Sequence, residues 1–132
     1  MNSRLKYWLE LAEYDFETAI VMLNSKRYLY VGFMLHQCIE KTLKAYYVFL
    51  NLENQPPYTH SLLKLAESSN LYSIMSDDYK DLLDMLEPLN IEARYPTHKE
   101  RLLKELTHEK CSDLLKNTEE LYLWIKTRLT ME

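Results

Sequence analysis

The stretch from residue 28 to residue 50 constrains the fold most, because it contains no proline and only one glycine. Such a segment favours a helix of several turns. At about 100° per residue, apolar side chains fill most directions around this helix. They are Leu35, Cys38, Ile39, Leu43, Ala45, Tyr46, Phe49 and Leu50. A helix that is apolar over most of its circumference lies at the centre of a bundle, so we expect residues 28–50 to be the central helix.

Polar side chains interrupt this apolar surface in a single arc of about 140°. In order around the helix, the arc contains His36, Glu40, Lys44, Gln37 and Lys41. Buried charge is costly even when it is paired, so the arc needs an explanation. One interpretation is internal ion pairing, with Glu40 bound to Lys41 or Lys44 at the edge of the bundle. The other is a polar surface that faces a ligand or a partner, in which case all five residues are candidate binding residues. The sequence leaves both open.

The rest of the chain also favours helices. Its 132 residues include one glycine and four prolines, which leaves few turns, and 47% of them are hydrophobic, as in ordinary globular proteins. We therefore expect one all-α domain over residues 1–132, an up-down four-helix bundle with an additional short helix. The four main helices are expected at about residues 3–24, 28–50, 76–88 and 107–129. The short helix is expected to open at Thr59-His60, with Thr59 as its cap, and a turn of helix is expected within residues 99–106.

Charge and composition narrow the function classes. The formal charge of −4 argues against bulk attraction to nucleic acid. Locally, residues 76–92 carry six acids against one lysine, whereas residues 94–105 carry four cations against two acids. The 11 tyrosines exceed what a core needs and suit a protein interface, so we expect a homodimer.

The cysteines and the apolar runs of the chain argue against a metal site and against a membrane protein. Cys38 and Cys111 occupy positions that are typical of a helical core, where a free thiol behaves as a small hydrophobe. No Cys or His pair has metal-ligand spacing, so we expect no metal and no cofactor. The chain shows no signal-peptide pattern and no apolar run of about 20 residues. We therefore expect no membrane association and a cytoplasmic location.

His60 is the second candidate binding site, after the polar arc. It follows the pair Pro56-Pro57 at an expected helix start. A histidine in that position commonly bonds locally, which is the alternative to ligand binding.

The segment before the last helix is the third candidate, with Arg94, Tyr95 and His98 around Pro96. Proline fixes its own φ and restricts the preceding residue, so this loop is stiff. An arginine held beside a tyrosine suits binding of a phosphate, a nucleotide or a partner carboxylate. In the alternative, Arg94 pairs with Glu40 or with an acid of residues 77–92 and locks the loop.

Taken together, these motifs resemble a HEPN domain. The resemblance rests on His-Gln-x-x-Glu-Lys-x-x-Lys-Ala at 36–45, Thr-His at 59–60, Ala-Arg-Tyr-Pro at 93–96 and Trp124-Ile125 in the final helix. It implies a bundle of four to five helices that commonly forms homodimers. It also implies a partner, because small stand-alone members are often encoded beside a minimal nucleotidyltransferase, and many such pairs act as toxin and antitoxin.

In the nuclease branch of that family, an arginine, a spacer of four to six residues and a histidine form a metal-independent ribonuclease site. Here Arg94 and His98 are separated by three residues, so the chain departs from that pattern. The sequence together with the resemblance therefore favours a non-catalytic module. The resemblance implies a nucleotidyltransferase partner, and the residues favour binding of nucleotide or RNA phosphate through Arg94, Lys41 and Lys44. The alternatives are a ribonuclease toxin that uses Arg94 and His98, and a purely structural dimerisation domain.

Overall fold

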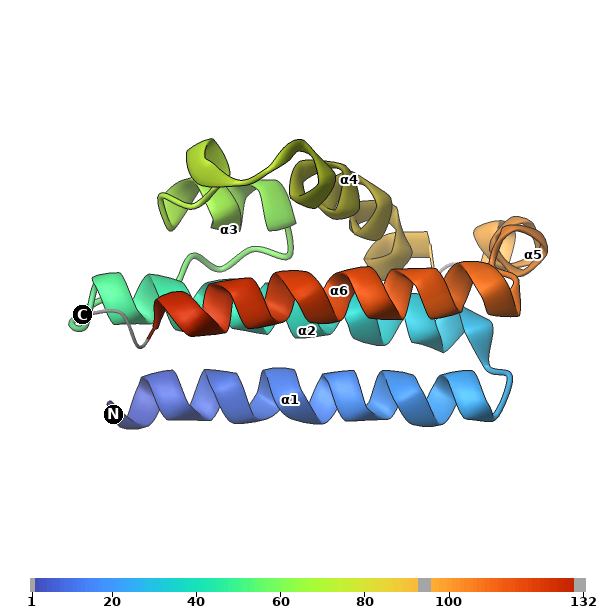
Figure 1. Ribbon diagram of the computed structural model, residues 1–132, viewed down its shortest axis with the longest axis horizontal. Helices are drawn as coiled ribbons and strands as arrows, with labels where there is room; N and C mark the ends of the chain where they lie inside the picture. Colours follow the sequence, from blue (N-terminus) through green and yellow to red (C-terminus); the bar gives the residue numbers. More distant parts are fainter. Residues whose placement is uncertain (1, 93–95, 130–132) are drawn as a thin grey trace.

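The structure is a computed structural model that describes residues 2–92 and 96–129, with side chains described outside 91–99 (Figure 1). Within these ranges there are six α-helices, one 3-10 turn and no strand. They are α1 (Ser3–Asn24), α2 (Tyr28–Leu50), α3 (Leu62–Ser68), the 3-10 turn η1 (Tyr72–Ile74), α4 (Asp77–Glu92), α5 (Pro96–Glu105) and α6 (His108–Arg128). The all-α prediction is confirmed.

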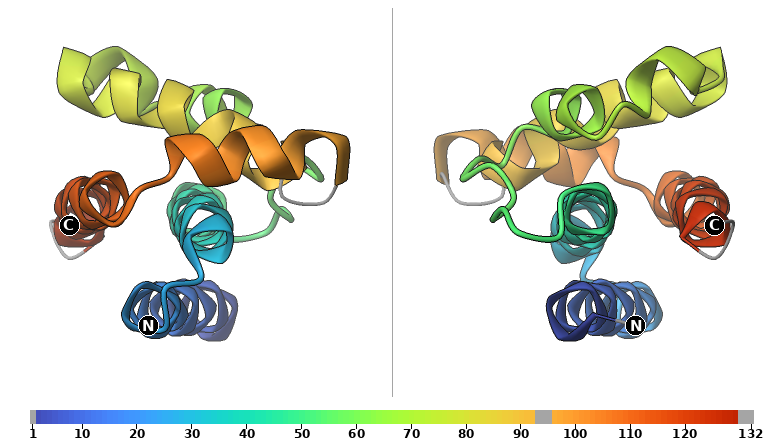
Figure 2. Two further views of the ribbon diagram at one scale, coloured as in Figure 1. Left: turned by 90° about the vertical axis from the view of Figure 1, so that its right-hand side faces the viewer. Right: turned by 90° about the vertical axis from the view of Figure 1, so that its left-hand side faces the viewer.

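Helix α2 lies at the centre of the molecule, as its apolar circumference predicts. It contacts α1, α3, α4, α5 and α6. Figure 2 shows α2 with α1 on one side, α6 on a second and the group of α3, α4 and α5 on a third. Fourteen of its 23 residues are buried, so its polar arc also lies within the fold and must be paired there.

The single glycine allows two helices to approach closely. A Cβ atom at Gly32 of α2 would lie 2.8 Å from Cδ1 of Leu89 in α4. Leu89 is itself almost fully buried, so the missing side chain gives it space against α2. This packing contact connects the central helix to α4.

The predicted end of α4 was wrong, and α5 extends beyond the turn of helix that was predicted. Helix α4 continues through Pro88 to Glu92, although a proline was expected to end it. Pro88 is exposed, whereas Leu89 and Asn90 beyond it are buried, so their packing holds the helix together past the missing N–H donor. Helix α5 spans ten residues, where the sequence indicated only a turn.

The short helix also begins later than expected. Ser61, not Thr59, caps α3, because the Ser61 hydroxyl accepts a hydrogen bond from the Lys64 amide at 3.2 Å. The Thr59 hydroxyl accepts one from the Ser61 amide at 3.1 Å, so it orders the approach to the helix. Thr107 caps α6, as predicted. No described helix is both long and apolar enough to cross a membrane.

Candidate functional site

Glu40 is the centre of a buried polar cluster on α2. Its side chain is 4% exposed, and its Oε2 accepts a hydrogen bond from Nζ of Lys44 at 3.1 Å. Its Oε1 lies 3.0 Å from Nδ1 of His60 and 3.8 Å from Nδ1 of His36. The spacing of four residues places His36, Glu40 and Lys44 in a row on one helix face. His60 approaches from the segment before α3, so three basic side chains surround one carboxylate.

The remaining polar residues of the arc turn to other helices. Lys41 forms an ion pair with the buried Asp15 of α1. Gln37 donates a hydrogen bond from Nε2 to Oδ1 of Asn90 in α4 at 2.9 Å, and both residues are buried. The Lys44 ammonium also lies 5.4 Å from the ring centroid of Trp8 in α1. The arc therefore connects α2 to α1, to α4 and to the segment before α3.

The Glu40–Lys44 contact agrees with the internal-pairing interpretation, whereas Lys41 pairs with Asp15 rather than with Glu40. A phosphate that bound Lys41 or Lys44 would compete with Asp15 or Glu40 for the ammonium group. The assignment of His36, Gln37, Glu40, Lys41, Lys44 and His60 to ligand or partner binding stays a prediction.

His60 connects the segment before α3 to the central helix. Its side chain is 58% exposed, so it is the member of the Glu40 cluster that reaches solvent most. The same segment is tied to α1 by Arg4, which donates hydrogen bonds to the carbonyl of Leu52 at 2.9 Å and to that of Asn54. The cluster therefore lies between a buried helix and an anchored surface loop.

Glu87 of α4 is a residue that the sequence analysis missed. Both of its carboxylate oxygens accept a hydrogen bond from the Leu62 amide at 3.1 Å, at the start of α3. A carboxylate at a helix N-terminus is favourable because the amide groups there have no partner within the helix. No sequence signal could have shown this pairing, because the two residues are 25 positions apart and on different helices.

Arg94 and Tyr95 lie outside the described residues. His98 lies in the first turn of α5, outside the described side chains. Helix α5 begins at Pro96, two positions after Arg94. The roles predicted for Arg94, Tyr95 and His98 stay predictions.

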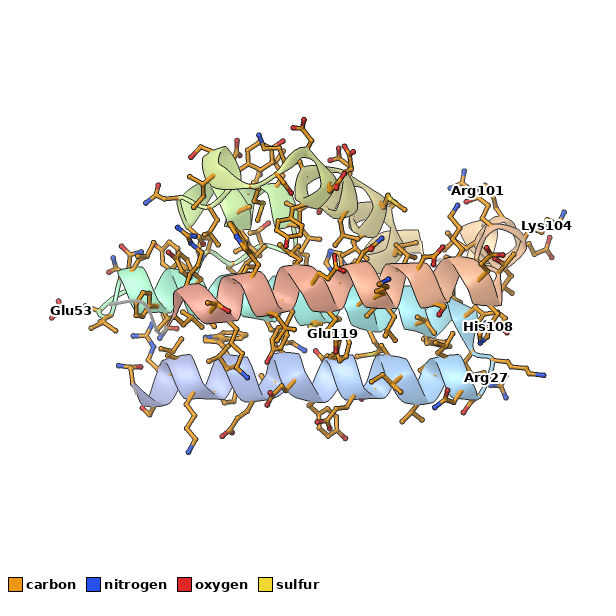
Figure 3. All side chains as sticks on the ribbon, in the orientation of Figure 1. Arg27, Glu53, Arg101, Lys104, His108 and Glu119 are labelled. Carbon is orange, nitrogen blue, oxygen red and sulfur yellow. The ribbon has the colours of Figure 1, made fainter. Side chains whose placement is uncertain are left out.

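Exposed basic side chains gather at one end of the molecule. Figure 3 shows Arg27, Arg101, Lys104 and His108 together at the end formed by the α1–α2 turn, α5 and the start of α6. Acids share this end, since Glu100, Glu105 and Glu109 are also exposed. The sequence showed the excess of cations in residues 94–105. That Arg27 and His108 lie at the same end was missed, because they come from segments far apart in the chain.

The two thiols are buried, and burial disfavours their nucleophilic thiolate forms. Burial raises the pKa of Cys38 to about 12, and it raises the pKa of Cys111 to about 11. Both cysteines are therefore protonated thiols near neutral pH, as expected for core residues. Among the described residues, no group of three or more His, Cys, Asp or Glu side chains is arranged to hold a metal ion.

Comparisons with known proteins place the fold. The model of the HEPN domain family matches residues 5–128. A crystal structure of TT1696 from Thermus thermophilus superposes with a TM-score of 0.79 at 21% identity, covering 96% of this chain and 98% of that one. ST0689, described as an archaeal HEPN homologue, superposes with a TM-score of 0.66 at 19% identity, covering 97% and 99%. No curated protein matches the chain. Since the family model spans nearly the whole sequence, the chain belongs to the HEPN domain family.

Proposed function

We propose that this chain is a non-catalytic HEPN-type binding module that holds nucleotide or RNA phosphate at the end formed by the α1–α2 turn, α5 and the start of α6. The observation that carries the proposal is the gathering of Arg27, Arg101, Lys104 and His108 from three separate segments at one end of the bundle. Cations brought together from separate segments can contact several phosphates of one ligand at once.

Arg94 is the residue that we propose contacts phosphate directly. It precedes α5 by two positions, and α5 carries Arg101 and Lys104. A guanidinium can bind two phosphate oxygens at once. Lys41 and Lys44 support this role less, because each forms an ion pair with a carboxylate of the chain.

The proposed partners are a second copy of this chain and a minimal nucleotidyltransferase, with the pair acting as toxin and antitoxin in the cytoplasm. This part rests on the family, whose small stand-alone members are often encoded beside such an enzyme. An adjacent gene for a minimal nucleotidyltransferase whose product co-purifies with this chain would support the partnership, and a purified pair that does not associate would contradict it.

The test of phosphate binding uses fluorescence anisotropy with a fluorescein-labelled single-stranded RNA and with a labelled adenine nucleotide. Both titrations are done in buffer that contains a metal chelator. Arg94→Ala should weaken binding about five- to ten-fold, which corresponds to about 1–1.4 kcal/mol. Lys104→Ala should weaken binding to a similar extent, and His98→Ala less than about two-fold. The matched control is Lys64→Ala, an exposed lysine on α3 at the other end of the molecule. It should have no effect.

Salt separates charge recognition from other binding. If two or three phosphates are contacted, the logarithm of the binding constant should fall with the logarithm of salt concentration with a slope of about −1.5 to −2. If neither added salt nor Arg94→Ala weakens binding, the proposal is refuted. If the chain cleaves RNA in the presence of a chelator, and His98→Ala abolishes that cleavage, the ribonuclease alternative is correct instead. Base catalysis needs the imidazole, whereas charge recognition does not.

A further inference from the structure

A groove runs along the exposed side of α4. Its first part, of about 340 Å³, lies between α4 and α6, with Leu82 and Met85 on the α4 side. Its second part, of about 260 Å³, adds α5 as a further wall and reaches Leu89 of α4 and Leu102 of α5. Met85 lines both parts, so the two depressions adjoin along α4.

The size of the groove matches a helix. From Asp78 to Leu89 the α4 wall spans 11 residue steps, or about 16 Å, which is the length of about three helical turns. Met85 lies in the middle of this wall and is 46% exposed, whereas Leu82 and Leu89 beside it are buried. A flexible methionine over an apolar floor adapts well to a docked apolar side chain.

The charge along the groove indicates what it would accept. Asp78, Asp81 and Glu120 line the first part. Burial raises the pKa of the nearby Tyr79 hydroxyl, and the charge of Glu120 adds to that shift. This part therefore favours cations.

At the other end, the lining changes to two cations and one acid, namely Arg101, Lys110 and Glu105. The positive end of a helix dipole is its N-terminus, so a docked helix is favoured when its N-terminus lies near Asp78 and its C-terminus near Arg101.

We propose that this groove docks an amphipathic helix of a partner protein, with lysine or arginine in the N-terminal half of that helix. Its apolar residues, at spacings of three and four, pack on Met85 and Leu82, and its cations meet Asp78, Asp81 and Glu120. The inference rests on the proposed role of the chain as an interaction module and names the surface that the partner uses.

A second copy that inserted its own α4 would fit the groove poorly. The exposed face of its own α4 carries Asp77, Asp78, Asp81 and Asp84, so inserting that helix would bring like charges together. A docked helix with positively charged side chains is favoured instead.

The test uses a fluorescein-labelled synthetic helix of about 14 residues with an apolar stripe and three lysines in its N-terminal half. The control peptide has the same composition with the lysines moved to the C-terminal half. In anisotropy titrations with the full chain, the first peptide should bind at least ten-fold more tightly than the control. Met85→Lys should weaken its binding at least ten-fold. Val21→Lys, at a 56% exposed position on α1, should leave it unchanged. Thermal melting followed by circular dichroism confirms that both variants are folded.

Equal binding of the two peptides, or binding that Met85→Lys leaves intact, would overturn the inference. So would a dimer that Met85→Lys converts to a monomer, because the groove would then hold a second copy. RNA binding is measured on the same variants and should not be weakened by Met85→Lys, because Met85 is not among the basic side chains proposed to contact phosphate. If the chain binds the peptide but not RNA, the groove proposal stands and phosphate recognition is refuted. If the chain binds RNA but not the peptide, only the groove proposal is refuted.

Discussion

Replacing Glu40 with glutamine tests whether the polar arc of α2 is held by internal ion pairing. Glutamine keeps the shape of the side chain and removes its charge, so Lys44 loses its counterion at a side chain that is 10% exposed. His60 loses its charged acceptor at 3.0 Å as well. Removing one partner of a buried pair leaves an uncompensated charge, which typically costs about 3–5 kcal/mol.

The structure places the expected cost at the low end of that range, about 3 kcal/mol. The Lys44 ammonium keeps the Trp8 ring at 5.4 Å, which offsets part of the loss. For a domain of this size a loss of about 3 kcal/mol lowers Tm by about 10 °C. Urea unfolding followed by circular dichroism, with a thermal melt in parallel, measures both quantities.

The chain contains a matched control. Lys6 and Glu10 have the same spacing of four residues on α1, but their side chains are 68% and 65% exposed at 3.9 Å. Glu10→Gln should therefore change the free energy of unfolding by at most about 0.5 kcal/mol, because an exposed pair is screened by water. The double variant Glu40→Gln/Lys44→Met, which removes both charges, should recover most of the loss. If Glu40→Gln costs less than about 1 kcal/mol, or no more than Glu10→Gln, the cluster does not hold the fold as we infer.

Three further predictions concern the core, the thiols and the assembly. Leu43 is fully buried, so Leu43→Ala should lower the free energy of unfolding by about 2–5 kcal/mol in urea titrations, and a loss below about 1 kcal/mol would contradict its core position. Cys38 and Cys111 should react with a disulfide reagent at pH 8 at least about 100-fold more slowly in the native chain than in urea, and native labelling within minutes would contradict this. Since burial raises their pKa values from 9.0 to about 12 and about 11, their contribution to stability is present below pH 9 and is lost as pH rises towards 11 and 12. Light scattering at micromolar concentration should show a homodimer, and a monomer would refute that expectation.

The sequence by itself was sufficient for the main helices and for the central place of α2. Helix periodicity is a local property, and α2 is apolar over so much of its circumference that only a central position buries it. The caps also follow local rules, as Thr107 shows at the start of α6. Where a local rule competes with packing, packing prevails. Pro88 should have ended α4, but buried Leu89 and Asn90 keep the helix going.

Only the tertiary structure decided which partners the polar residues meet. The sequence placed Lys41 and Gln37 in one arc, and the fold sends Lys41 to Asp15 and Gln37 to Asn90. The fold likewise brings the Glu87 carboxylate to the Leu62 amide at the start of α3. Periodicity specifies which face of a helix is polar, but the partner of a polar side chain depends on which helix packs against that face and at what height. Those are set by the packing of the whole bundle, which no local stretch of sequence contains.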